Sequence, residues 1–217
     1  MKLFLDSADL TEIREAASLG VISGVTTNPT LLAKSAGGKP VQAIIEEICA
    51  LVPGGPVSME CVSDDAEGMI AEGRKFATWG KDVYVKVPFC TEGVKAVYAF
   101  SQENISTNVT LVFSLNQALL AANAGATLIS SFVGRLDDIG FDGLQVIEQC
   151  VDMVHNYGFD AQILAASIRH PLHVTQSVAA GAHIATIPFK VLKQMYGHPL
   201  TTSGIAQFKA DWEKVSA

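Results

Sequence analysis

KDVYVKVP, residues 81–88, is a run of β-branched and aromatic residues closed by a proline, which predicts a β-strand. Side chains alternate across a strand, so the three valines share one face while Tyr84 and Lys86 share the other. The run is almost continuously apolar, which is typical of a parallel strand covered by helices on both sides. A parallel sheet with helical connections is therefore the first hypothesis.

Lys86 is the exceptional residue of this strand, because no counter-ion lies next to it in sequence. Burying an ammonium group is costly, and burial favours the neutral amine. A neutral lysine amine is a nucleophile that forms a Schiff base with a carbonyl. The alternatives are an ammonium group that reaches solvent at the strand end, or one that pairs with a distant carboxylate.

Outward from this stretch, strand-like and helix-like segments alternate eight times, at roughly 25 residues per unit. Eight such units close a (β/α)₈ TIM barrel. The predicted strands are 2–6, 22–27, 57–62, 81–88, 106–112, 127–133, 161–166 and 183–187. The predicted helices are 10–18, 41–51, 64–79, 91–102, 114–123, 142–157, 171–179 and 188–196. A doubly wound open sheet is the alternative, although no GxGxxG follows the first strand.

The chain is expected to be one TIM-barrel domain, residues 1–217, with an additional C-terminal helix at about 203–215. That helix carries an apolar stripe of Ile205, Phe208, Trp212 and Val215. The stripe is expected to pack either against its own barrel or against a neighbouring subunit.

Composition narrows the class of protein. A net charge of −7 argues against a nucleic-acid surface, and no uninterrupted apolar run approaches the length that spans a membrane. The four cysteines, Cys49, Cys61, Cys90 and Cys150, show no zinc-binding spacing and indicate reduced thiols. The N-terminal apolar run is too short for a signal peptide, so we expect a cytoplasmic protein without membrane, nucleic-acid or metal partners.

Polar side chains recur on one parity near the carboxyl ends of six successive strands, where such barrels place their active sites. The residues on this parity are Asp6, Thr26, Asn28, Ser58, Glu60, Lys86, Asn108, Thr110, Ser130 and Phe132. The opposite parity, which is expected to face the helices, holds Val57, Met59, Cys61, Val109 and Leu111.

Each polar residue also has an ordinary interpretation. Asp6 could cap a helix, Asn28 could be a turn residue before proline, and Asn108 could be a buried amide bonded to backbone. Glu60 is harder to explain, because a carboxylate between apolar neighbours needs a partner, and Lys86 on the next strand is the nearest. The convergence of six strands favours a functional site.

Two arginines follow the next pair of strands. Arg135 follows the sixth strand, and Arg169 follows the seventh with Ser167 beside it. Guanidinium groups and a hydroxyl on adjacent loops are suited to bind a phosphate. The alternative for Arg135 is a salt bridge to Asp137 or Asp138.

Several of these segments together resemble the transaldolase family, specifically its short-chain, fructose-6-phosphate aldolase-like branch. The resemblance covers essentially the whole chain. Its motifs are LFLDSA, GVTTNPTLL, VSMECVS, VYVKVP, NVTLVFSLNQALLAANAGATLISSFVGRLDD and ILAASIR.

The resemblance implies a Schiff base between Lys86 and the C2 carbonyl of a ketose phosphate, sedoheptulose 7-phosphate or fructose 6-phosphate, in the pentose phosphate pathway. It implies that Asp6 takes the C4 hydroxyl proton, and that Glu60 and Thr110 hold a water that shuttles protons. No metal or organic cofactor is implied. The implied substrate contacts are Asn28, Asn108 and Ser130 to the dihydroxyacetone fragment, and Arg135, Ser167 and Arg169 to the phosphate.

The same resemblance bears on the choice between transfer and cleavage. The similar fructose-6-phosphate aldolases carry glutamine at the Glu60 position and tyrosine at the Phe132 position, so this chain resembles the transaldolase type. The alternatives are an aldolase that releases free dihydroxyacetone, and a sugar-phosphate-binding protein without catalysis. The branch also implies a homo-oligomer, a pentamer or decamer, and Cys90 could make activity sensitive to oxidation.

Overall fold

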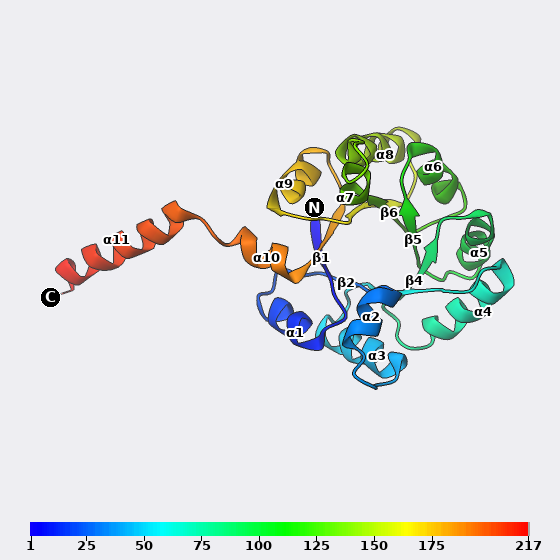
Figure 1. Ribbon diagram of the computed structural model, residues 1–217, viewed down its shortest axis with the longest axis horizontal. Helices are drawn as coiled ribbons and strands as arrows, with labels where there is room; N and C mark the ends of the chain where they lie inside the picture. The colour runs from blue at the N-terminus through cyan, green and yellow to red at the C-terminus, as the bar shows by residue number, and fades with distance from the viewer. Residues whose placement is uncertain (217) are drawn as a thin grey trace.

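The structure, a computed structural model, describes residues 1–216, so the last residue of the predicted 1–217 domain lies outside the described part. Within that part, eight parallel strands close into a barrel in sequence order, with β1 beside both β2 and β8 (Figure 1). The predicted (β/α)₈ barrel is therefore confirmed, and the open sheet is excluded. The strands are β1 Lys2–Asp6, β2 Val25–Thr26, β3 Val57–Glu60, β4 Val83–Pro88, β5 Thr107–Val112, β6 Leu128–Phe132, β7 Gln162–Ala166 and β8 Ile184–Ile187.

Helices surround the barrel as an outer ring, except for α11, which extends away from it (Figure 1). They are α1 Leu10–Ser18, α2 Pro29–Ser35, α3 Val41–Leu51, α4 Ala66–Ala77, α5 Thr91–Gln102, α6 Leu115–Asn123, α7 Val133–Asp137, α8 Gly143–Tyr157, α9 Pro171–Ala179, α10 Phe189–Met195 and α11 Pro199–Val215.

Two short helices lie in stretches for which no helix is predicted. Asn28 is not a turn residue, because it caps α2 and Pro29 occupies the first position of that helix, an arrangement that starts a helix. The stretch between the predicted strand 127–133 and the predicted helix 142–157 contains α7, and β6 accordingly ends at Phe132. Strand β2 is also shorter than the predicted 22–27. Neither α2 nor α7 is long enough to show apolar periodicity in sequence.

The strands separate two apolar layers. The layer between barrel and helices contains Val57, Met59, Cys61 and Val109, as the parity argument predicts. A second cluster fills the inside of the barrel around Phe4, Leu128, Leu164 and Ile184, together with Phe132 and Ala166. This inner cluster fills the lower part of the barrel and leaves the carboxyl ends of the strands for polar groups.

Leu111 is a correction to that argument, because it packs with the inner cluster and not against the helices. The pairing of β5 with β6 shifts register between Val109 and Val112, and Leu111 adopts a φ of 58°. A bulge of this kind turns one side chain to the other face of a strand.

Helix α11 extends away from the barrel, as the red segment of Figure 1 shows, and has no buried residue. It begins at Pro199, four residues before the predicted start at 203. Within the described chain, the alternative in which its apolar stripe packs on its own barrel is wrong. No helix of residues 1–216 has the length and apolar character needed to cross a bilayer.

Candidate active site

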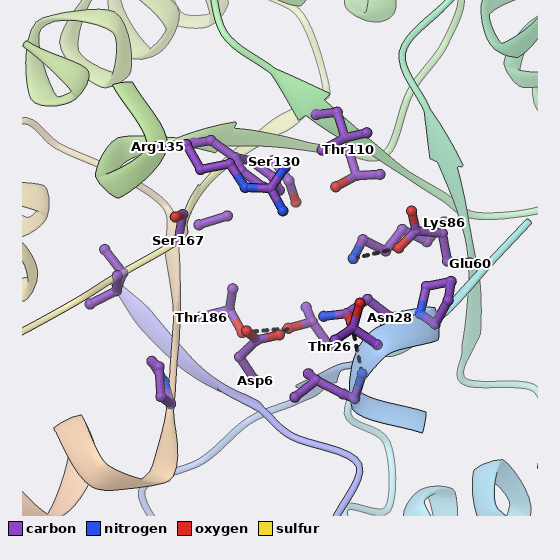
Figure 2. A pocket seen from close by; sticks show the side chains of 18 of the residues that line it. Asp6, Thr26, Asn28, Glu60, Lys86, Thr110, Ser130, Arg135, Ser167 and Thr186 are labelled. Carbon is purple, nitrogen blue, oxygen red and sulfur yellow. Dashed lines mark hydrogen bonds and ion pairs between the residues drawn. The ribbon is translucent and has the colours of Figure 1, made fainter. Parts of the chain in front are cut away.

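A cavity of about 460 Å³ opens at the carboxyl ends of the strands, as in other barrels of this architecture. Figure 2 shows side chains from β1, β2, β3, β4, β5, β6 and β8 converging on it. Of the residues predicted for the site, those that line the cavity are Asp6, Asn28, Glu60, Lys86, Thr110, Ser130, Phe132, Arg135, Ser167 and Arg169.

Lys86 and Glu60 form an ion pair at the centre of this site. The Lys86 Nζ lies 3.0 Å from Glu60 Oε2 and donates to the Thr27 carbonyl oxygen at 3.0 Å. Only 8% of the lysine side chain and 13% of the glutamate side chain are exposed. The two residues are Cα partners in the β3–β4 ladder, so the strand pairing itself brings them together. The Glu60 carboxylate, which was expected to need a partner, is therefore paired with Lys86.

Thr110 lies on the next strand with its hydroxyl unused. The Thr110 side chain is buried, yet its Oγ1 has no hydrogen-bond partner within the described chain. Pro88 and Thr110 are Cα partners, which places the threonine beside the end of the lysine strand. A buried hydroxyl with free hydrogen-bonding capacity is suited to hold a water or a substrate group.

Asn108 is the one predicted site residue that does not line the cavity. Its Nδ2 donates to Ser58 Oγ at 3.0 Å, and its Oδ1 accepts from Ser130 Oγ at 2.6 Å. Asn108 and Ser58 are both fully buried, so this network lies beneath the cavity floor. Ser130 connects it to the cavity.

Asp6 points into the barrel and does not cap a helix, since α1 is capped by Asp9. The Thr26 hydroxyl donates to Asp6 Oδ1 at 2.8 Å and lies 2.6 Å from the Thr186 hydroxyl. Burial raises the pKa of the Asp6 carboxyl, while the positive charge of Lys86 and the Thr26 hydrogen bond partly oppose that rise. A carboxyl whose pKa is raised in this way is suited to accept and return a proton.

Arg135 projects into the cavity from α7. Its guanidinium lies 5.0 Å from the centre of the Phe132 ring, a cation–π contact. Gly134 allows α7 to approach the loop after β7, since its N–H donates to the Ser167 carbonyl at 3.1 Å and a Cβ there would lie 2.6 Å from Arg169 Nε. Ser167 itself adopts a φ of 59°, a left-handed conformation that is costly for a non-glycine residue.

Among the described residues, Asp138 forms a salt bridge with Arg169 and not with Arg135. The Arg169 Nη2 lies 2.8 Å from Asp138 Oδ2, and both side chains are more than half exposed. The Arg169 backbone N–H donates to His173 Nδ1 at 3.3 Å, while His173 Nε2 lies 3.0 Å from Asp137 Oδ2. Burial lowers the pKa of His173, which favours the neutral ring with its proton on Nε2. The two aspartates therefore fix the loop that carries Arg169.

Asn28 caps a helix, a role that the sequence argument did not consider, and it also lies at the cavity. Its Oδ1 caps α2 by accepting the Leu31 N–H at 3.0 Å, and the residue still lines the cavity. The sequence argument assigned no role to Thr26 and did not consider Thr186, although the alternation that selected Asp6 also places Thr186 inside β8 with Ile184. Nothing in the sequence indicated that Asp137, Asp138 and His173 together hold the loop that carries Arg169.

Within residues 1–216, no group of three or more His, Cys, Asp or Glu side chains is arranged to hold a metal ion. The fold and cavity place the chain among (β/α)₈-barrel proteins that hold a lysine–carboxylate pair inside the barrel. A solved structure with the same fold is thiamine phosphate pyrophosphorylase from Pyrococcus furiosus, with a TM-score of 0.62, 14% identity, and 86% of this chain and 85% of that one covered.

Sequence comparison identifies the family. Residues 3–217 match the family described as Transaldolase/Fructose-6-phosphate aldolase. Proteins named probable transaldolase are similar along almost their whole length: one from Thermoanaerobacter sp. (strain X514) is 57% identical over 99% of this chain and 98% of its own, and one from Halalkalibacterium halodurans is 58% identical over 98% and 99%. The chain belongs to the transaldolase/fructose-6-phosphate aldolase family and is therefore an enzyme.

Proposed function

We propose that this enzyme is a transaldolase that transfers a dihydroxyacetone unit from a ketose phosphate to an aldose phosphate through a Schiff base on Lys86. The observation that carries the proposal is the buried ion pair of Lys86 and Glu60, with a 3.0 Å Nζ–Oε2 separation, inside a polar cavity. The donors would be sedoheptulose 7-phosphate or fructose 6-phosphate, and the acceptors glyceraldehyde 3-phosphate or erythrose 4-phosphate. These are sugars of the pentose phosphate pathway, whose enzymes work in the cytoplasm.

In the first half of the reaction, Glu60 takes a proton from the Lys86 ammonium group, and the free amine attacks the C2 carbonyl of the ketose. The resulting carbinolamine loses water as Glu60 returns the proton, which leaves an iminium. Glu60 and the free Thr110 hydroxyl would hold a second water that shuttles these protons. Asp6 then accepts the C4 hydroxyl proton, and the electrons of the C3–C4 bond move into the iminium to give an enamine and the aldose product.

In the second half, the enamine carbon attacks the aldehyde of the acceptor and Asp6 returns its proton to the new hydroxyl. Hydrolysis of the iminium releases the product ketose and regenerates Lys86. Asn28 and Ser130 would bind the dihydroxyacetone hydroxyls, with Asn108 orienting Ser130 from below at 2.6 Å. Arg135, Ser167 and Arg169 would bind the phosphate at the cavity rim.

Glu60 and Phe132 favour transfer over release of free dihydroxyacetone. A carboxylate can cycle the protons of iminium formation and hydrolysis, whereas an amide only orients water. Phe132 is buried against Phe113, with ring centres 5.3 Å apart, and has no hydroxyl to protonate the enamine. The enamine therefore waits for an acceptor aldehyde.

Acceptor dependence tests this proposal. With fructose 6-phosphate alone, we expect release of glyceraldehyde 3-phosphate to stop after one equivalent per active site, and addition of erythrose 4-phosphate should start continuous turnover. Coupled assays for both products measure the two rates.

Glu60→Gln is expected to slow transfer by about 10²-fold, the scale of one general acid–base group, and to raise the ratio of cleavage to transfer. Glu47→Gln, at a surface ion pair, is the matched control.

Three results would contradict the proposal in different ways. Equal turnover with and without the acceptor would indicate an aldolase. Binding of fructose 6-phosphate without any turnover would indicate a binding protein. A Glu60→Gln enzyme with an unchanged transfer rate would remove the proposed role of the carboxylate.

The exposed helix α11 favours a homo-oligomer, which we propose is a pentamer or decamer. Its apolar stripe is open to solvent, with Phe208 76% and Trp212 69% exposed, and the two rings lie next to Ile205. An isolated helix of this length is marginal in water, so its apolar face needs a partner surface. A second copy of the chain is the partner we propose.

Trp212→Glu is expected to lower the subunit count, because a carboxylate on the stripe would have to be buried without a partner. Light scattering coupled to size-exclusion chromatography measures the mass of the assembly. Ala210→Glu adds the same charge on the opposite side of α11 and should leave the mass unchanged. An intact chain that runs as a monomer, or a Trp212→Glu assembly of unaltered mass, would rule out this role of α11.

A further inference from the structure

Three side chains from three neighbouring strands form a chain of hydrogen bonds at one wall of the cavity (Figure 2). Thr186 on β8 lies 2.6 Å from Thr26 on β2, oxygen to oxygen, and Thr26 lies 2.8 Å from the Oδ1 of Asp6 on β1. Both threonines are buried, and both line the cavity. Sequence comparison assigns neither of them a role.

The number of hydrogens fixes the direction of this chain. A threonine hydroxyl carries one hydrogen, so when Thr26 donates to ionised Asp6, the hydrogen between the two threonines must come from Thr186. When Asp6 is protonated on Oδ1, it can donate to Thr26, and Thr26 then donates to Thr186. The Thr186 hydroxyl then turns its own hydrogen toward the cavity. The two hydrogen bonds can thus reverse direction together, so that the threonines pair with Asp6 in either of its proton states.

The charged groups around Asp6 show why this chain of hydrogen bonds matters for the proton state of the carboxyl. The charged groups that act on the carboxyl are Lys86 from β4 and Glu60 from β3, which have opposite effects and pair with each other at 3.0 Å. Of the described side chains, Thr26 is the one whose hydrogen bond to Asp6 favours the ionised form. A polarised chain of hydroxyls strengthens each bond in it.

We propose that Thr186 is a positioning residue of the transferase reaction: by holding the Thr26 hydroxyl it sets how readily Asp6 takes and returns its proton. The inference rests on the proposed function, in which Asp6 is the acid/base of the C3–C4 bond. Thr186 acts only through Thr26, and this distinguishes it from a residue that supports the wall of the cavity.

Thr186→Val removes the hydroxyl and keeps the side-chain shape. Without the Thr186 donor, Thr26 is a weaker donor to ionised Asp6, so the pKa of Asp6 rises further. Since Asp6 must be ionised to take the C4 hydroxyl proton, the acidic limb of the kcat/KM profile should move to higher pH by about 0.5 to 1 unit. At pH values well below the midpoint of that limb, kcat/KM should fall about 3- to 10-fold, with KM nearly unchanged. Thr186→Ser should restore the profile.

The double variant separates positioning from packing. Thr26→Val should shift the same limb at least as far, and Thr26→Val/Thr186→Val should match Thr26→Val alone, because the second threonine no longer has anything to act through. Additive shifts, a Thr186→Val profile identical to wild type, or a change that Thr186→Ser does not reverse would each overturn the proposal.

A second readout does not depend on turnover. The ¹³C carboxyl resonance of Asp6, assigned with an Asp6→Asn variant, reports the proton state of this residue directly. Its titration midpoint should be higher in Thr186→Val than in wild type, and restored in Thr186→Ser. An unchanged midpoint overturns the role of Thr186, whereas a wild-type enzyme that shows no turnover contradicts only the proposed function.

Discussion

Lys86→Met is expected to abolish transfer of dihydroxyacetone, with a loss on the order of 10⁴-fold or more, the scale that follows removal of a covalent nucleophile. Methionine keeps most of the side-chain volume but has no amine to attack the carbonyl. Borohydride reduction in the presence of fructose 6-phosphate gives the direct measurement, because it converts the iminium into a stable amine. Peptide mass should show the adduct on Lys86 in wild type and none in Lys86→Met.

The control variants address stability and selectivity. Lys86→Met leaves the Glu60 carboxylate without its partner in a mostly buried position, which is expected to destabilise the fold by a few kcal/mol. Lys86→Met/Glu60→Gln removes that charge, so its thermal midpoint should recover while activity stays absent. Lys81→Met, at the exposed turn before β4, should be fully active. Label on another lysine, or substantial turnover in Lys86→Met, would contradict the Schiff-base assignment.

Arg135→Ala is expected to raise the KM for a phosphorylated donor by about 10- to 100-fold, because a charge-assisted hydrogen bond contributes about 1.5–3 kcal/mol. Its guanidinium is held over Phe132 and has no salt bridge within the described chain, so it is ready to bind an anion. Arg169→Ala should have a smaller effect, since Arg169 must leave Asp138, 2.8 Å away, to contact a phosphate. Steady-state kinetics with fructose 6-phosphate measure both variants.

Unphosphorylated fructose separates phosphate binding from chemistry. The low rate with this donor should be nearly the same in wild type and Arg135→Ala, because neither contacts a phosphate. Arg74→Ala, which removes an exposed ion pair with Glu103, is the matched control and should leave KM unchanged. Equal losses with fructose and fructose 6-phosphate would show that Arg135 supports the fold or the chemistry and not the phosphate.

Sequence patterns were sufficient for the barrel and for the lysine–glutamate pair, since both follow from strand periodicity. Alternation placed Lys86 inside, and adjacent parallel strands put Glu60 beside it. The same rule failed at Leu111, where a positive φ turns the side chain inward, because a bulge depends on how two strands pair and not on either strand alone.

Contacts between loops were beyond sequence reasoning for a related physical reason. The bond from Arg169 to His173, and the pair of His173 with Asp137, join residues whose distance depends on how α7 packs on the loop after β7. Helix α7 has five residues, too few to show periodicity, and Gly134 within it disfavours a helix in isolation. Its position follows from the close approach that Gly134 allows.

The placement of the lysine–glutamate pair on strands and of the rim residues on connecting segments has a consequence for engineering this enzyme. Lys86 and Glu60 are set opposite each other by backbone pairing inside the barrel, whereas Arg135, Ser167 and Arg169 are carried by connections at its rim. Exchanging those connections would leave the amine and its carboxylate in place. New acceptors or donors, including sugars without a phosphate, should therefore be obtained by varying 133–140 and 167–170 while the strand interior is kept constant.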